Sequence, residues 1–239
     1  RSYNYDTTAT GYKNMWRLKA QKEEAGNPYP THGLGPVAQI LNIHRGDRMA
    51  TLVSMSNAQK GMHLYAAEHD IAGEDTARID MGDMNTTLIR TAKGKTIMIQ
   101  HDVTSPRPYN RIHMVSGTKG FAQKYPLTGI ALEPNAHEFV SQQTLDSLLK
   151  VYEHPFCKEI GEKARKVGGH GGMDFIMDYR LIHCLKNGLP LDMDVYDAAE
   201  WSCLVELTDY SVRNGSVPVQ IPDFTRGEWD KLQGLTFAE

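Results

Sequence analysis

The chain has 239 residues, of which 40 % are hydrophobic and 23 % charged, the balance of an ordinary globular protein with an ample core. Its formal net charge of -3 gives no electrostatic reason to expect binding to nucleic acid or to an anionic membrane. No run of about 18 apolar residues is present to cross a membrane. The three cysteines lack the spacing of a disulfide framework or of a zinc site, and the histidines show no metal-ligand spacing. We therefore expect no metal.

The first clear element is a helix that begins at Thr31, a residue type that favours the N-cap position. Apolar residues then recur at helical spacing, at Leu34, Val37, Ala38 and Leu41. Gly46 is expected to end this helix. A strand follows at 49–56, and the polar residues 58–83 predict a loop with a little helix.

The next block is predicted to be β-structure. Strands at 85–91 and 96–104 flank Gly94, which indicates a hairpin turn. A second strand pair is expected around Gly117–Gly120. Four helices are then predicted, at about 137–151, 155–166, 171–187 and 194–213.

Strands followed by helices are typical of an α+β fold. We expect one open, mainly antiparallel sheet over 47–125 with the helices on one face, and a single domain that spans 1–239. The sequence contains no G-x-G-x-x-G motif after a strand, no H-E-x-x-H, no G-x-S-x-G and no Walker loop. A dinucleotide-binding domain is therefore not predicted within these residues.

The stretch "GNPYPTHGLGPVAQILNIHRGD" places Tyr29 and His32 three residues apart at a helix entrance, with Pro30 and Thr31 between them. The positive end of a helix dipole disfavours imidazolium, so His32 could serve as a general base near neutral pH. The alternative is that His32 caps the helix and Tyr29 packs as a loop aromatic. Spacing alone leaves both open.

Three further residues are candidates, each with a plain structural alternative. Arg17 follows Trp16 and could donate hydrogen bonds to a sugar, or could be a solvated helix residue. Tyr109 in "RPYNR" could contact a ligand or lie in a surface loop. His170 in "GGHGGMD" could be functional, or could simply precede a helix that has an acidic residue in its first turn.

Several long segments resemble the C-terminal domain of glycoside hydrolase family 109, and together they run from about residue 11 to 229. They are "GYKNMWRLK", "NPYPTHGLGPVAQILNIHRGD", "LVSMS", "SPRPYNRIHMVSGTKG" and "GGHGGMDFIMDYRLIHCLKNGLPLDMDVYDAAEWS", followed by "SVPVQIPDFTRG". These enzymes are NAD-dependent α-N-acetylgalactosaminidases of the glucose–fructose oxidoreductase and inositol dehydrogenase superfamily. The resemblance implies an N-terminal NAD-binding domain that these 239 residues do not include.

The resemblance also implies a mechanism. NAD would oxidise the sugar C3 hydroxyl, the glycosidic group would leave by elimination, water would add, and the ketone would be reduced again. Such enzymes are exceptions to the two-carboxylate rule, which fits the absence of a convincing carboxylate pair in this sequence. By resemblance, His32 and Tyr29 are the proton-transfer candidates, while Arg17, Tyr29, Pro30, Thr31, His32 and Tyr109 would contact the sugar. The resemblance implies no specific role for His170.

Two alternatives remain open: a domain of an NAD(P)-dependent sugar or polyol dehydrogenase, or a non-catalytic module for sugar contact and dimerisation. The expected partners are a small carbohydrate and a second copy bound through the open sheet face, with no nucleic acid. The chain without its NAD domain should be inactive. The compartment is not readable from the sequence; the resemblance points to bacterial proteins that are often exported.

Overall fold

A computed structural model describes residues 16–69 and 78–231, which form two compact units. Within the described residues, the first unit takes those up to Pro108 and those from Val195 onward, and the second takes Tyr109–Asp194. Both units lie inside the stretch that the sequence suggested as one domain. No helix of the described ranges is both long and apolar enough to pass through a membrane.

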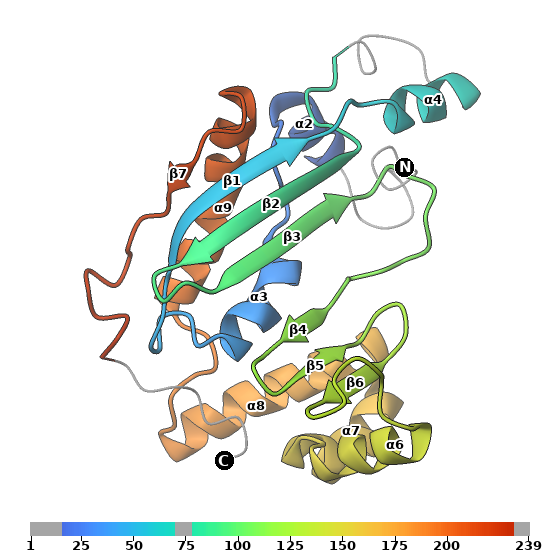
Figure 1. The fold of residues 1–239 in the computed structure, drawn as a ribbon, viewed down its shortest axis with the longest axis vertical. Helices are drawn as coiled ribbons and strands as arrows, with labels where there is room; N and C mark the ends of the chain where they lie inside the picture. The colour runs from blue at the N-terminus through green and yellow to red at the C-terminus, as the bar shows by residue number, and fades with distance from the viewer. Residues whose placement is uncertain (1–15, 70–77, 232–239) are drawn as a thin grey trace. The chain divides into compact units, whose positions relative to one another are not determined.

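The first unit is built on a four-stranded antiparallel sheet with strand order β3-β2-β1-β7 (Figure 1). Its strands are β1 (Met49–Ser56), β2 (Met84–Thr91), β3 (Thr96–Asp102) and β7 (Val219–Gln220). The first three confirm the sequence prediction, including the turn at Gly94, where φ is 84°. The short fourth strand comes from the residues after α9, where the sequence predicted no strand.

The expectation of one sheet over 47–125 is wrong, because the strands after β3 form a separate sheet in the second unit. The connection contains Pro106 and Pro108. Proline has no N–H to give to a strand ladder, so this segment cannot continue the first sheet. The strands beyond it pair with one another instead.

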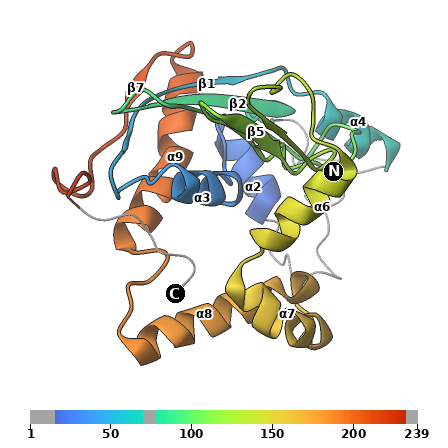
Figure 2. The same ribbon diagram turned by 60° about the horizontal axis from the view of Figure 1, so that its bottom comes forward.

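Helices α2 (Trp16–Glu23), α3 (Thr31–Ile40) and α9 (Val195–Arg213) lie on one face of the first sheet (Figure 2). The core lies between α3, α9 and the sheet; its members include Leu34, Ala38, Leu52, Ile89, Ile97, Ile99, Trp201 and Leu204. Each fully buried leucine contributes about 1.5–3 kcal/mol by leaving water. An open antiparallel sheet with helices on one face is thus confirmed for this unit. Helix α4 (Gly61–Glu68) follows β1.

Helix α3 begins and ends one position or more away from where the sequence placed it. Pro30 is the N-cap residue, and Thr31 is the first helical residue rather than the cap. At the other end the Asn42 and Ile43 amides donate to the Gln39 and Ala38 carbonyls, at 3.1 and 2.9 Å. This is the Schellman pattern with Asn42 in the left-handed position at φ 56°, so the helix ends well before Gly46.

The opposite face of the first sheet bears a row of apolar side chains. Val53, Leu88 and Met98 are directly opposite one another on β1, β2 and β3. Leu88 is 50 % exposed and Met98 is 49 % exposed. Among the described helices of this unit, α2, α3 and α9 lie on the other face of the sheet (Figures 1 and 2).

The second unit contains a three-stranded antiparallel sheet, β4 (Met114–Ser116), β5 (Gly120–Gln123) and β6 (Gly129–Leu132). Its helices are α6 (Gln142–Val151), α7 (Pro155–Val167) and α8 (Met173–Asn187), with a short 3-10 helix at His170–Gly172. The sequence predicted β4, β5 and the three helices but missed β6. Helix α6 starts later than predicted because Ser141 caps it, accepting from the Thr144 amide.

Candidate active site

The loop before α3 is fastened to α9. The Asn27 amide donates to Thr208 Oγ1 at 2.8 Å, and the Ala25 amide donates to Asp209 Oδ1 at 2.6 Å. Between them, a Cβ on Gly26 would lie 2.3 Å from the Asp209 nitrogen, so only glycine allows this close approach. The loop therefore takes its position from a helix that lies about 180 residues later in the sequence.

This loop presents Tyr29 and His32 as a stacked pair. Asn27 Oδ1 accepts from the Tyr29 amide at 2.9 Å, which forms a local turn. The two rings stack with centroids 4.6 Å apart, and the Tyr29 hydroxyl lies 3.4 Å from His32 Nε2. Both side chains are exposed at the entrance of α3. A phenol and an imidazole in this arrangement can exchange a proton with each other and with a bound ligand.

Arg17 on α2 lies beside this pair. Its guanidinium carbon is 4.4 Å from the Trp16 ring centroid and 5.3 Å from the Tyr29 ring centroid. Both distances are within the range of cation–π contacts. The cation is therefore held between two aromatic rings, one of which belongs to the stacked pair.

A pocket opens where α2, the loop and the end of β3 meet. Residues that line it include Trp16, Arg17, Gln21, Pro28, Tyr29 and His101. Aromatic faces with a few polar groups are typical of sugar-binding sites, because the rings pack on C–H groups while the polar atoms bind hydroxyls. Trp16 is 41 % exposed and Tyr29 is 36 % exposed, so both rings are accessible to a ligand.

His101 is a pocket residue that the sequence reasoning missed. It lies near the end of β3, and burial, with a smaller effect of the Arg17 charge, lowers its pKa to about 4 despite the nearby Asp102. Its imidazole is therefore neutral at physiological pH. The signal that could have revealed it is the strand pattern: Ile97 and Ile99 point inward, and the next inward position holds a histidine.

The structure brings together part of the predicted set. Arg17 and Tyr29 line one pocket and His32 stacks on Tyr29, while Pro30 and Thr31 form the start of the helix between them. Two glycines near His32 have a packing role: a Cβ on Gly33 would meet Ile99, and one on Gly35 would meet Trp201, at 3.3 and 3.1 Å. They allow α3 to approach the sheet and α9 closely.

Tyr109 and His170 belong to the second unit. Tyr109 is 72 % exposed, accepts a hydrogen bond from Arg111 Nε and meets Tyr125 edge-on. His170 Nδ1 lies 3.0 Å from both carboxylate oxygens of Asp174, in the exposed segment before α8. This contact accounts for His170 structurally. That either residue contributes to the pocket of the first unit stays a prediction.

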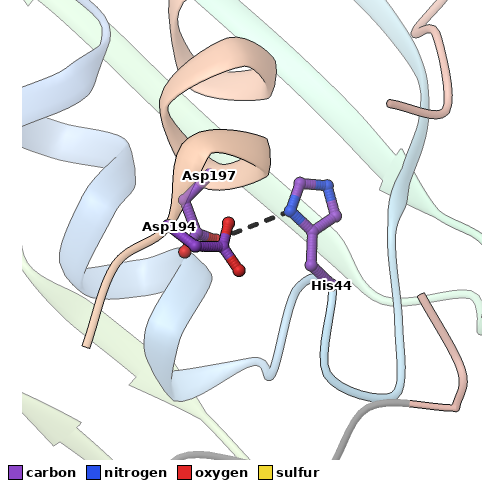
Figure 3. A group of neighbouring side chains, drawn as sticks. All are labelled: His44, Asp194 and Asp197. Atoms are coloured by element: carbon purple, nitrogen blue, oxygen red, sulfur yellow. Dashed lines mark ion pairs between the residues drawn. The ribbon is translucent and has the colours of Figure 1, made fainter. Parts of the chain in front are cut away.

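A second cluster of charged side chains is buried between the turn after α3 and the start of α9 (Figure 3). Arg45 donates twice to Asp197, Nη1 to Oδ1 at 3.0 Å and Nη2 to Oδ2 at 2.7 Å. His44 Nε2 lies 3.0 Å from Glu200 Oε2, and His44 Nδ1 lies 3.5 Å from Asp197 Oδ1. Asp197 lies in the first turn of α9, and its carboxylate is only 2 % exposed.

Burial alone would lower the pKa of His44, but the two carboxylates outweigh it and raise that pKa to about 9. Burial raises the pKa of Glu200, opposed by His44. The Arg45 charge beside Asp197 disfavours a metal cation at this point. Asp194, also drawn in Figure 3, precedes α9 in the chain and is assigned to the second unit. We therefore treat His44, Arg45, Asp197 and Glu200 as a structural ion-pair cluster.

The described residues do not fit a dinucleotide. The strands of both sheets pair antiparallel, and in the described part of the chain no strand leads through a helix into a parallel neighbour. The glycines at 168–172 precede α8, but they follow the helix α7. A pyrophosphate site on a strand-to-helix turn is thus not found in these ranges.

Comparison with known proteins gives consistent matches. The family model described as "Glycosyl hydrolase 109, C-terminal domain" matches residues 3–231. An "Alpha-N-acetylgalactosaminidase" of Bacteroides fragilis is 57 % identical over 231 residues, which are 96 % of this chain and 54 % of that protein. A "Glycosyl hydrolase family 109 protein" of Porphyromonas gingivalis is 52 % identical over 241 residues, covering 95 % and 51 %. The chain spans about half the length of these relatives.

Among solved structures, a levoglucosan dehydrogenase in complex with NADH and levoglucosan aligns with a TM-score of 0.49. It is 14 % identical, and the alignment covers 73 % of this chain and 45 % of the dehydrogenase.

Proposed function

From the premise that this chain belongs to the glycosyl hydrolase 109 family, as its C-terminal domain, we propose that it forms the substrate-binding part of an NAD-dependent α-N-acetylgalactosaminidase. The observation that carries the proposal is the pocket lined by Arg17 and Tyr29, with His32 stacked on the Tyr29 ring. These are the residues that the family resemblance singled out for the sugar. They come from α2 and from the loop before α3, so local capping alone does not account for their meeting.

In this proposal each residue has a distinct task. His32 accepts or returns a proton at the sugar ring, and the Tyr29 hydroxyl, 3.4 Å away, relays it or contacts a sugar hydroxyl. Arg17 donates hydrogen bonds while its charge is held against Trp16 and Tyr29. Pro30 and Thr31 fix the spacing of the pair at the helix start. Contact between Tyr109 and the sugar stays a prediction of the family resemblance.

We propose that NAD is bound by a part of the complete protein outside these 239 residues, as the family resemblance implies. When bound, the cofactor would supply the reversible oxidation of a sugar hydroxyl. This chain would supply the surface that orients the sugar and the groups that move its protons.

The test is turnover of an aryl α-N-acetylgalactosaminide by the complete protein and by this 239-residue chain with added NAD. We expect release of the aryl alcohol and the free sugar by the complete protein, with no net NADH, and none by the chain alone. Net accumulation of NADH from a free sugar would favour a dehydrogenase instead. Turnover by the chain alone would refute the assignment of NAD to another domain.

We also propose that two copies associate through the outer face of the first sheet. The row of Val53, Leu88 and Met98 offers accessible apolar side chains on adjacent strands, and Met55 beside it is 63 % exposed. Identical apolar faces can meet about a two-fold axis, which is the commonest way in which soluble proteins form dimers.

A further inference from the structure

His101 occupies an inward position where an apolar residue would continue the core. Strand alternation places it on the same face as Ile97 and Ile99, which are 3 % and 6 % exposed. Directly opposite on β2 lies Asn85, which is 1 % exposed. His101 is the next inward residue of the edge strand β3, and it lines the pocket at the border of the core.

The ring is polar and half-buried, and it lines the pocket together with Arg17 and Tyr29. Because burial and the Arg17 charge keep the imidazole neutral, with a pKa of about 4, it offers one N–H donor and one acceptor nitrogen.

We propose that the imidazole of His101 hydrogen-bonds the bound sugar and so orients it against Tyr29 and Arg17. A sugar hydroxyl both donates and accepts, which matches the two nitrogens, whereas the guanidinium of Arg17 can only donate. The inference rests on the proposed function, since it names a further contact to the same sugar. His101 is thereby a binding residue that positions the ligand, and the proton transfer stays with His32.

The experiment compares two substitutions in the complete protein, His101→Leu and His101→Gln. The first keeps the bulk and removes both polar atoms, and the second restores one donor and one acceptor. His63→Leu is the matched control, because His63 is exposed on α4 and does not line the pocket. The readouts are Kd for N-acetylgalactosamine by calorimetry, kcat and KM on an aryl α-N-acetylgalactosaminide, and the melting temperature.

For His101→Leu we expect Kd and KM to rise about five- to tenfold, as the loss of one neutral hydrogen bond predicts, with kcat within about twofold. His101→Gln should recover part of the loss, and His63→Leu should match wild type. The ratio of wild type to His101→Leu should stay constant between pH 5.5 and 8, because the neutral ring faces Arg17 and Asp102 without titrating there.

Unchanged Kd and KM in His101→Leu, with an active wild type, would overturn the inference and leave His101 a core residue. Inactivity of the wild type on every α-N-acetylgalactosaminide would instead overturn the proposed function. The Kd values of wild type and His101→Leu for N-acetylgalactosamine would then still test the role of His101. A wild type that neither turns over nor binds the sugar would overturn both.

Discussion

At the scale of single residues, the stacked rings of Tyr29 and His32 place a phenol and an imidazole within 3.4 Å of each other on an exposed surface. Neither side chain belongs to the core around Leu34 and Trp201. Replacing either side chain should therefore lower the rate of the reaction more than it lowers the stability of the fold.

We expect His32→Ala in the complete protein to lower kcat on an α-N-acetylgalactosaminide by about 10²–10⁴-fold, the usual contribution of a general acid–base group. Because His32 is exposed, the free energy of unfolding should fall by about 1 kcal/mol or less. The control is His63→Ala on α4, which should change neither quantity. A normal kcat together with a large fall in melting temperature would leave His32 a structural residue.

The sequence led to Tyr29 and His32 because both lie in one short stretch with unusual spacing. It did not lead to His101, because in the sequence this residue is only one position of an alternating strand. Its role depends on α2, which lies beside the end of that strand and forms the pocket with it. Nor could spacing reveal that Asp197 binds Arg45 and His44, because those partners are more than 150 positions away. Contacts of this range depend on the packing of α3 against α9.

At the scale of elements, α9 has two tasks: it covers the sheet, and it holds the loop that carries Tyr29. Thr208 Oγ1 accepts from the Asn27 amide, and Asn27 is only 1 % exposed. Removing this acceptor would leave a buried N–H without its partner, which costs about 1–3 kcal/mol.

Thr208→Val keeps the shape of the side chain and removes the hydroxyl. We expect the free energy of unfolding to fall by about 1–3 kcal/mol, and kcat/KM to fall as well, because the loop that positions Tyr29 is released. Urea unfolding and steady-state kinetics measure the two effects. Thr208→Ser retains the hydroxyl and should stay near wild type; equal behaviour of both variants would contradict this role.

The ion-pair cluster at the other end of α9 predicts a pH dependence. The pKa of His44 is about 9 in the folded protein against 6.5 for the free side chain. A raised pKa stabilises the fold fully below pH 6.5, and the contribution is lost as pH rises through 9. The raised pKa of Glu200 acts in the same direction.

We therefore expect the urea midpoint to fall between pH 6.5 and 9.5, with a change in unfolding free energy of at most about 3 kcal/mol from His44. His44→Gln should be less stable at pH 6.5 and should show a flatter profile. A wild-type profile that rises over this range, or is flat, would show that His44 is not charged in the folded protein.

Element types were largely predictable, because hydrophobic periodicity and turn residues act locally. The strands 49–56 and 96–102, the Gly94 turn and the long C-terminal helices all follow from such local signals. The partition into two sheets did not, since it depends on which strands meet after Pro106 and Pro108. The two-residue strand β7 could not be predicted either, because so short a segment is recognised as a strand only by its pairing with β1.

At the scale of the whole molecule, the outer face of the first sheet should decide the oligomeric state. We expect the chain to be a dimer by light scattering, and Leu88→Lys to shift it to a monomer, because lysine would place a charge in the centre of the apolar row. Leu88 is half exposed in the chain, so the melting temperature of the monomer should change little. The control is His63→Lys on α4. A monomeric wild type would contradict the proposed association.

The interruption of the first unit by the second has a further consequence, in the order of synthesis. Residues up to Pro108 leave the ribosome with most of the sheet, but Trp201, Leu204 and Ile221, which complete the same core, follow only after the whole second unit. Until then the inward faces of Leu52 and Ile89 lack α9. Long-range closure of this kind slows folding and leaves apolar surface open to aggregation. While roughly ninety further codons are translated, this apolar surface stays open. The yield of folded protein then depends on protection of that surface in the cell as much as on the stability of the finished fold.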